Sequence, residues 1–435
     1  MATPDMTIFA LSSGAPPAGV AVVRISGPRS LSALQQLTKQ VLPEPRQAAV
    51  RTLLSGSGYI LDQALVLAFR APQSFTGEDC VELHLHGSRA TINAVLEELR
   101  TMDDLRPAEA GEFSRRAFDN GRLDLVEAEG LSELLSAETE MQRRLAVEQS
   151  FGGQSRLYEG WAERLTHARA MIEAELDFAD EDDVPGSVGG RMMADMVELR
   201  RELGEHIAAA RGGEIIRDGY KVAIIGAPNA GKSSLLNVLA DREVAIVTDV
   251  AGTTRDILQV DLDLDGYLVK LYDTAGLRET QDVVEQEGVR RARSLMEHAD
   301  LLLLLEEIDS GAQRPDLPPH KDVLLVGSKL DQHSTSDAYD LCISTISGAG
   351  FPLLRSLLLE RVREVWSGSV APTRKRQLHL LEDASNSIDD ALKADQLELR
   401  AEHLRAAAAA LGRITGRVDV EALLDVIFSQ FCIGK

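Results

Sequence analysis

Residues 226–234, Gly-Ala-Pro-Asn-Ala-Gly-Lys-Ser-Ser, restrict the fold of this chain more than any other segment. They directly follow the apolar run 221–225, so the pattern predicts a strand, a glycine-rich loop and the start of a helix. Such a loop turns tightly and its backbone N–H groups converge on phosphate oxygens, next to the favourable dipole of the helix N-terminus. Lys232 is expected to reach the outer phosphates, and Ser233 to offer its hydroxyl to Mg²⁺.

Two motifs that follow this loop are typical of a magnesium- and phosphate-sensing site. Residues 248–256 contain Thr254, which we expect to ligate Mg²⁺ and to sense the γ-phosphate. Residues 271–276 end a strand with Asp273, which can hold Mg²⁺ through water. The N–H group of Gly276 can then meet the γ-phosphate.

A third motif indicates which base is bound. Residues 328–331, Ser-Lys-Leu-Asp, follow the buried-strand pattern 323–326. Asp331 can accept both N–H donors on the edge of guanine, and adenine does not present that pair of donors. Together the motifs predict a GTPase domain; the alternatives are a P-loop ATPase and a nucleotide fold without activity.

The pattern does not by itself identify the residue that orients the attacking water. Leu277 stands where Ras carries a glutamine, and leucine cannot orient water. Glu285 could do so directly or through a second water; alternatively it is a solvated helix residue. Because no arginine finger is evident, a bound cation could supply charge to the transition state.

Composition limits the remaining classes. With 435 residues the chain is long enough for two or three domains. No apolar run approaches the roughly 18 residues that span a bilayer, and we expect no signal peptide. Three widely spaced cysteines favour a reducing cytosol. A net charge of −23 disfavours non-specific binding to nucleic acid, so any RNA contact is expected to be local or shared with a partner.

The chain divides into regions of different patterning. Residues 1–120 mix short alternating runs with turns, as a small α+β domain does. Residues 121–215 and 374–435 carry helical spacing, and residues 216–370 alternate strands with helices. We therefore predict three domains: an N-terminal α+β domain, a discontinuous helical domain, and a Ras-like P-loop GTPase domain inserted into it.

Two further features have alternative interpretations. Cys432 lies beside the terminal Lys435, so its thiol is either a reactive thiolate or an inert small apolar group. His84, His86 and Glu82 share one face of a strand; a metal site is conceivable, but polar surface residues are the simpler interpretation.

Several motifs together resemble one family. The segments that carry the resemblance are 22–27, 75–79, 81–83, 111–118, 177–183, 411–416 and the Cys-Ile-Gly-Lys tail 432–435. They are similar to those of the tRNA modification GTPase family MnmE, also called TrmE, over essentially the whole chain. The GTPase motifs alone would fit several families, whereas the N-terminal segments and the tail are much more specific.

The resemblance implies a cytoplasmic homodimer built through the N-terminal domains, each binding 5-formyl- or 5,10-methylene-tetrahydrofolate. It implies an FAD-dependent partner, MnmG. Together they would add a carboxymethylaminomethyl or aminomethyl group to carbon five of the tRNA wobble uridine. GTP hydrolysis, stimulated by K⁺ and by pairing of the GTPase domains, would drive the cycle.

The resemblance also implies roles for single residues. Folate contacts fall on Arg24, Glu82, Arg122 and Lys435; K⁺ ligands on Asn229, Thr248, Val250 and Thr253; Mg²⁺ ligands on Ser233 and Thr254; and catalytic roles on Glu285 and Cys432. The expected nucleotide contacts are Asn229, Ala230, Gly231, Lys232, Ser233, Ser234, Thr248, Asp249, Val250, Ala251, Gly252, Thr253, Thr254, Asp273, Thr274, Ala275, Gly276, Ser328, Lys329, Leu330, Asp331, Ser344, Thr345 and Ile346.

This sequence departs from the family pattern at a few positions. Ser328 replaces the usual asparagine of the guanine motif, so we expect weaker nucleotide binding. Residues 344–346 replace the usual Ser-Ala start of the last base-binding loop, Ala110 replaces a proline, and Arg122 replaces a lysine. None of these changes removes a catalytic group.

Three functions remain open from the sequence. The first is the tRNA-modifying enzyme, the second a ribosome-assembly GTPase, and the third a GTP-controlled scaffold with degenerate catalysis. A ribosome-assembly factor predicts a basic RNA-binding surface, which this acidic chain lacks. Folate binding by residues 1–120 would separate the first function from the other two.

Overall fold

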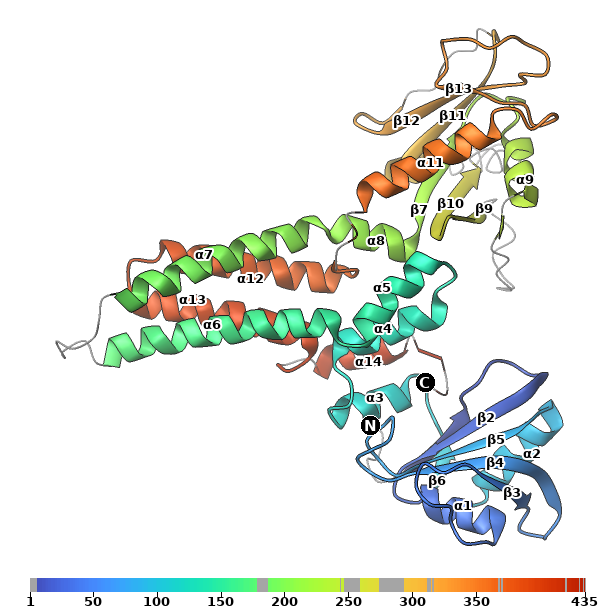
Figure 1. The fold of residues 1–435 in the computed structure, drawn as a ribbon, viewed down its shortest axis with the longest axis vertical. Coiled ribbons are helices and arrows are strands. Elements are labelled where there is room, and N and C mark those ends of the chain that lie inside the picture. Colours follow the sequence, from blue (N-terminus) through green and yellow to red (C-terminus); the bar gives the residue numbers. More distant parts are fainter. Residues whose placement is uncertain are drawn as a thin grey trace, which may run out of the picture. The chain divides into compact units, whose positions relative to one another are not determined.

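The chain forms two compact units, Met1–Ser132 with Gly412–Lys435, and Glu133–Leu411. Both are drawn in Figure 1. The computed structural model describes residues 6–177, 187–242, 244–245, 259–273, 293–310, 314, 317–366, 368, 371–418, 421–429, 431–432 and 434.

The first unit contains a six-stranded sheet with strand order β3-β4-β5-β2-β1-β6. Its neighbouring strands are antiparallel except for the parallel pair β1 and β6. The elements are β1 (Thr7–Leu11), β2 (Ala18–Ser26), α1 (Ser30–Thr38), β3 (Ala49–Leu54), β4 (Ile60–Phe69), β5 (Cys80–Gly87), α2 (Arg89–Arg100), β6 (Leu105–Pro107), α3 (Glu112–Asp119), the start of α4 (Leu125–Ser136) and α14 (Glu421–Ser429).

Helices α1 and α2 pack on one face of this sheet. Leu34 and Leu37 of α1 and Val95 and Leu99 of α2 join the inward-facing strand residues in one apolar core. These helix residues recur at the spacing of one helical face, which is why the two helices bury that side. Because side chains alternate across a strand, the other sheet face carries a separate set of side chains.

The second unit contains most of the helical part. Its helices are α5 (Glu140–Ser150), α6 (Gly153–Asp177), α7 (Ser187–Ala208), α8 (Ala210–Asp218), α12 (Lys375–Lys393) and most of α13 (Leu397–Thr415). Helix α7 packs against α6 and also against α12, which lies far away in the sequence (Figure 1). The expectation of a discontinuous helical domain is therefore confirmed.

A seven-stranded sheet completes the second unit, with strand order β13-β12-β11-β7-β10-β9-β8. Its elements are β7 (Tyr220–Ile225), α9 (Lys232–Arg242), β8 (Val244–Ala245), β9 (Gln259–Leu264), β10 (Tyr267–Asp273), β11 (Leu301–Glu307), β12 (Asp322–Ser328), β13 (Leu341–Cys342) and α11 (Phe351–Val365). Strands β10, β7, β11, β12 and β13 are parallel, and apolar residues bury both faces. The predicted α/β fold is confirmed.

The two units are defined by contacts between residues, whereas the domain boundaries were predicted from sequence patterning, so the two divisions differ. Residues 412–435 belong to the unit of the N-terminal sheet, although their helical spacing placed them with the helical domain. The boundaries 1–120, 121–215 with 374–435, and 216–370 therefore stay a prediction. None of the helices that the structure describes is long and apolar enough to cross a membrane.

Candidate functional sites

The glycine-rich loop joins the end of β7 to the start of α9. Gly226 has φ +152°, and a Cβ atom on it would lie 2.1 Å from the carbonyl oxygen of Leu305. Asn229 and Gly231 also have positive φ, at 62° and 98°. Only glycine fits at position 226, where the backbone lies closest to Leu305, and this allows the loop to turn tightly at the end of β7. Its N–H groups and the start of α9 then form a cradle for an anion.

Charged and hydroxyl side chains meet at this loop. The Lys232 ammonium donates hydrogen bonds to the carbonyl oxygens of Gly226 (2.9 Å) and Ala227 (2.8 Å). Ser233 Oγ donates to Oδ2 of Asp273 at 2.9 Å. Asp273 is fully buried at the end of β10, which pairs with β7. Two side chains 40 residues apart, both expected near Mg²⁺, thus lie in direct contact.

Ser328 ends β12 at the far side of the site. Its hydroxyl is buried and has no hydrogen-bond partner among the residues that the structure describes. The next residue, Lys329, has φ +60° and places its ammonium 2.5 Å from the Glu307 carboxylate. The hydrogen bond from Lys329 holds the pKa of Glu307 below its usual range. Lys329 is thereby fixed in place, whereas the hydroxyl of Ser328, at the usual asparagine position, makes no hydrogen bond to any described residue.

Asp331 is held ready to accept hydrogen bonds. Ser344 Oγ donates to Asp331 Oδ1 at 2.6 Å, and this hydrogen bond lowers the pKa of Asp331. The same serine oxygen accepts from the N–H groups of Ile346 (3.3 Å) and Ser347 (3.1 Å). Thr345 is half-buried. An oriented, ionised carboxylate is what recognition of guanine requires.

Some of the predicted site residues lie outside the described residues. They are Thr248, Asp249, Val250, Ala251, Gly252, Thr253, Thr254, Thr274, Ala275, Gly276, Glu285 and Lys435. Of the four predicted K⁺ ligands, only Asn229 is described.

A second candidate site is a cavity of about 240 Å³ in the first unit. It is lined by Arg24, Arg46, Phe69, Gln73, Ser74, Phe75, Cys80, Glu82 and Arg122. Three of the four residues predicted to bind folate are therefore in its wall. Arg24 on β2 and Glu82 on β5 are paired in register, and Nε and Nη2 of the arginine lie 3.1 and 2.9 Å from Glu82 Oε1.

Aromatic rings flank this ion pair. The Arg24 guanidinium lies 4.9 Å from the centre of the Phe75 ring and 5.8 Å from that of Phe113. Rings and a guanidinium in such proximity favour each other electrostatically and present a partly apolar wall. The cavity therefore combines ring surfaces, cations and one carboxylate, a combination suited to a flat polar ring that bears an anionic tail.

The histidines of β5 differ in burial: His84 is half-buried, with its Nε2 atom buried, and His86 is exposed. His84 Nε2 lies 3.6 Å from Glu82 Oε2, and His86 Nδ1 lies 2.7 Å from Asp62 Oδ1. In the part of the chain that the structure describes, no group of three or more His, Cys, Asp or Glu residues is placed to hold a metal ion.

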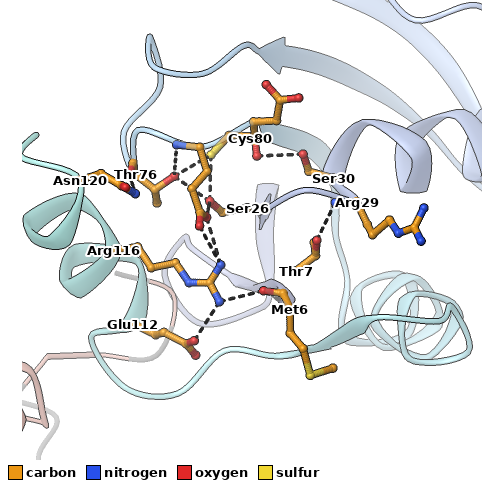
Figure 2. Close-up of polar contacts among 12 residues, drawn as sticks. Met6, Thr7, Ser26, Arg29, Ser30, Thr76, Cys80, Glu112, Arg116 and Asn120 are labelled. Carbon is orange, nitrogen blue, oxygen red and sulfur yellow. Dashed lines mark hydrogen bonds and ion pairs between the residues drawn. The ribbon is translucent and has the colours of Figure 1, made fainter. Parts of the chain in front are cut away.

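A buried polar network stands behind the cavity wall (Figure 2). Ser26 Oγ lies 2.6 Å from Thr76 Oγ1 and 2.7 Å from Glu78 Oε2. Arg116 on α3 donates to both oxygens of Glu78, at 3.1 and 3.0 Å, and to Glu112 Oε1 at 3.2 Å. It also donates to the carbonyl oxygen of Met6 at 2.9 Å, so the network joins four separate segments.

Cys80 connects this network to the cavity. Its sulfur lies 3.1 Å from both the Ser26 and the Thr76 hydroxyl (Figure 2). The Cys80 side chain also forms part of the cavity wall.

The segments around Ser26, Thr76 and Arg116 contribute to the family resemblance, but the sequence alone assigned these residues no role. The available signal was Ser26 at the end of the apolar strand β2 and Arg116 beside Phe113 and Ala117 on α3. Thr76 lies in the loop before β5, where its polarity gives no signal.

The C-terminal tail docks on β1 within the same unit. Ser12 Oγ donates to the Gly434 carbonyl oxygen at 2.8 Å. Gly434 has φ +100°, and a Cβ on it would lie 2.1 Å from the Leu11 carbonyl oxygen. Leu11 pairs with Val23, the residue before Arg24, so Gly434 contacts β1 at a residue that is paired with the strand carrying the cavity arginine. The Cys432 side chain is exposed.

Comparisons with known proteins agree along the chain. The family model described as "GTP-binding protein TrmE N-terminus" matches residues 7–122, and "MnmE helical domain" matches residues 125–432. The tRNA modification GTPase MnmE of Sinorhizobium medicae (strain WSM419) is 58% identical over 438 residues, covering 99% of each chain. That of Rhizobium etli (strain CIAT 652) is 58% identical over 440 residues, covering 100% of each.

A solved structure, the G domain of the T. maritima FeoB iron transporter, aligns with 33% of this chain and 97% of its own. It is 24% identical, with a TM-score of 0.24, which is too low for a comparison of folds.

Replacing Arg116 with methionine should loosen helix α3. The change removes the cation shared by the half-buried Glu78 carboxylate and the buried Glu112 carboxylate, although Glu112 keeps its pair with Arg106, so the local opening free energy should fall by about 2 kcal/mol. Hydrogen–deuterium exchange of α3 peptides in the full chain measures this energy. The control is Arg115→Met, whose exposed pair with Asp425 is worth less than about 1 kcal/mol. Equal exchange in the two variants would contradict the prediction.

The same network predicts a dependence on acid. Burial favours the neutral form of Glu112, but the hydrogen bonds from Arg106 and the Glu109 N–H group, with the charges of Arg106 and Arg116, lower its pKa from 4.5. A lowered carboxyl pKa stabilises the fold above about pH 4.5, and this stabilisation is lost as the pH falls through the folded-state pKa. Protection of α3 in the unvaried chain should therefore approach that of Arg116→Met as the pH falls through the folded-state pKa of Glu112, which lies below 4.5.

Two serines of the base-binding end should respond differently to replacement by alanine. Ser328→Ala removes a hydroxyl without a partner among the described residues, so guanine-nucleotide affinity should change by less than about twofold. Ser344→Ala removes the hydrogen bond that orients Asp331, so affinity should fall about tenfold. Titration with a fluorescent GDP analogue measures both constants. A larger loss for Ser328→Ala than for Ser344→Ala would sink this assignment.

Proposed function

This chain belongs to the MnmE family of tRNA modification GTPases, and we propose that it modifies the tRNA wobble uridine together with an FAD-dependent MnmG protein. The added group on carbon five would be carboxymethylaminomethyl or aminomethyl. The observation that carries this proposal is the cavity of the first unit, where Arg24 and Glu82 are paired beside aromatic rings. A GTPase that acted only as a switch would have no use for such a cavity.

The cavity suits a tetrahydrofolate. The Glu82 carboxylate can accept paired hydrogen bonds from the N–H groups of a pterin ring, and the ring can lie along the Phe75 side chain. Arg24 holds Glu82 in place, and Arg122 and Lys435 would meet the carboxylates of the tail. The folate, when bound, supplies the one-carbon unit. The contact of Gly434 with Ser12 and Leu11 supports the role of Lys435, because Leu11 is paired with Val23, which precedes Arg24 on β2.

The loop of the second unit suits GTP with Mg²⁺. Lys232 and the N–H groups of the loop would bind the phosphates, and Asp331 the guanine. Ser233, Thr254 and, through water, Asp273 would hold Mg²⁺; the observed contact of Ser233 with Asp273 supports this pairing. Glu285 would orient water, and Asn229, Thr248, Val250 and Thr253 would hold K⁺.

The exposed face of the N-terminal sheet supports a homodimer. Val50 pairs with Leu65, Leu65 with His84, and His84 with Val22, so these residues follow one row across the sheet. Val50 and Leu65 are 58% and 38% exposed on the face opposite α1 and α2. Apolar strand residues on an open face are typical of a protein interface. The cavity residues Arg24 and Glu82 lie on this same face, so a partner subunit would cover it.

Two other functions fit less well. A ribosome-assembly GTPase needs a cationic surface for RNA, whereas this chain has a net charge of −23. A scaffold with degenerate catalysis would rest on Ser328 alone, and Lys232, Ser233, Asp273 and Asp331 keep the contacts expected of an intact site. We place the enzyme in the cytoplasm, where its tRNA substrate and reduced cysteines would be found.

The decisive experiment measures wobble-uridine nucleosides by mass spectrometry. Cells that lack their own enzyme, but contain a compatible flavoprotein, would express this chain. We expect the modified uridine to return with the unvaried chain and to stay absent with Glu285→Ala and Cys432→Ser. Glu279→Ala and Cys342→Ser are the matched controls and should restore it. Normal expression without any modified uridine would exclude the proposed function while leaving the GTPase assignment intact.

The dimer has its own test. Leu65→Glu places a charge at the centre of the exposed row, so the chain should elute as a monomer where the unvaried chain is a dimer. Size-exclusion chromatography with light scattering, at micromolar concentration, measures the mass. Leu353→Glu, at a leucine of α11 that is more exposed (52%) than Leu65, should leave the dimer unchanged. A dimer that survives Leu65→Glu would place the interface elsewhere.

A further inference from the structure

The charges in the wall of the cavity do not balance. Three arginines and one glutamate line it, which is a net charge of +2. Arg24 is paired with Glu82, and both side chains are largely buried. Arg46 and Arg122 are exposed, and among the residues that the structure describes neither of them forms an ion pair. Two uncompensated cations therefore lie at the exposed part of the cavity, and the neutralised pair lies deeper.

Arg46 is held firmly at this place. The backbone N–H group of Arg46 donates to the Ala68 carbonyl oxygen at 2.8 Å, and Nη2 of its guanidinium donates to the Gln73 carbonyl oxygen at 3.2 Å. Gln73 is itself a wall residue, and its N–H group is bonded to the Arg70 carbonyl oxygen at 2.8 Å. One donor of the guanidinium is thus used for positioning, and the others stay available for a ligand.

The backbone at Arg46 is unusual for an arginine. Its φ is +65°, in the left-handed region where glycine or asparagine is the ordinary choice. A large side chain in a conformation that it disfavours suggests a function for that side chain. The position of Arg46 in the cavity wall, its hydrogen bonds and its left-handed backbone together indicate that its guanidinium binds a ligand.

We propose that Arg46 binds the second carboxylate of a folate's glutamate tail, beside Arg122, and so selects ligands with two carboxylates over ligands with one. This inference rests on the proposed folate function and extends it to a residue that no motif singled out. A planar guanidinium pairs with a carboxylate through two parallel hydrogen bonds. The ammonium group of a lysine carries the same charge but cannot form this paired geometry. Two such cations match the two carboxylates of one glutamyl group.

The test compares two ligands by isothermal titration calorimetry with the full chain. One is 5-formyl-tetrahydrofolate, which carries a glutamate; the other is 5-formyl-tetrahydropteroate, which carries the same ring system and one carboxylate. We expect Arg46→Gln to weaken binding of the folate about tenfold and that of the pteroate less than twofold. Arg46→Lys should fall between, because it keeps the charge and loses the paired geometry.

Two control variants separate binding from folding. Arg89→Gln removes an exposed arginine at the start of α2, outside the cavity wall, and should bind both ligands like the unvaried chain. Arg46→Gly fits the left-handed backbone, so it should keep the melting temperature and show the same tenfold loss for the folate.

Three outcomes would overturn the inference. In the first, Arg46→Gln binds the folate as tightly as the unvaried chain. In the second, it loses the same factor for both ligands, which would make Arg46 a support of the cavity and not a receptor for the tail. In the third, the unvaried chain binds neither ligand, and the proposed folate function then fails as well. Only the third outcome affects that function, so the two failures can be told apart.

Discussion

Arg116 lies between two carboxylates in the interior of the first unit, and the arrangement of that unit depends on its ion pairs. Burying a guanidinium is costly unless anions and carbonyl oxygens replace its water. Glu78, Glu112 and the Met6 carbonyl oxygen do so here, which fastens helix α3, the loop before β5 and the first residues of the described chain to one another. The hydroxyls of Ser26 and Thr76 contact each other and the sulfur of Cys80, so the network extends to the cavity wall. The network therefore supports the cavity wall at Cys80.

The two sites recognise their ligands by different physical means. At the loop of the second unit, recognition depends mainly on backbone conformation. A Cβ atom at Gly226 would lie only 2.1 Å from the Leu305 carbonyl oxygen, so only glycine allows this close approach, and the N–H groups of the loop can then converge on an anion. At the cavity, side-chain charge and ring surfaces act instead, with Arg24 and Glu82 paired across neighbouring strands. Phosphates lack distinguishing shape, so a cradle of dipoles suffices for them. A pterin with a carboxylate tail needs donors and acceptors at separate places.

The nucleotide site was more predictable from the sequence than the cavity. Its loop, strand ends and base motif are continuous segments, and parallel strands bring their carboxyl ends together, so Ser233 and Asp273 could be expected to meet. Ser328 was recognised as a departure, and the structure adds that its hydroxyl has no partner within the described residues. Arg24, Glu82 and Arg122 were assigned through family resemblance and not through spacing. Arg46 escaped notice because it sits in a turn, with no motif around it and 22 residues from Arg24 in the chain.

The sequence by itself determined the local elements and the chemistry of the loop, because glycine positions, apolar runs and alternation act over a few residues. It also determined, through its family motifs, that the chain is a tRNA modification GTPase. Only the tertiary structure decided that residues 412–435 belong to the unit of the N-terminal sheet, that Gly434 docks on Leu11, and that three arginines and one glutamate line the same cavity. Such contacts join residues tens to hundreds of positions apart. Their free energy depends on burial and on the charges that meet there, and no local pattern encodes either.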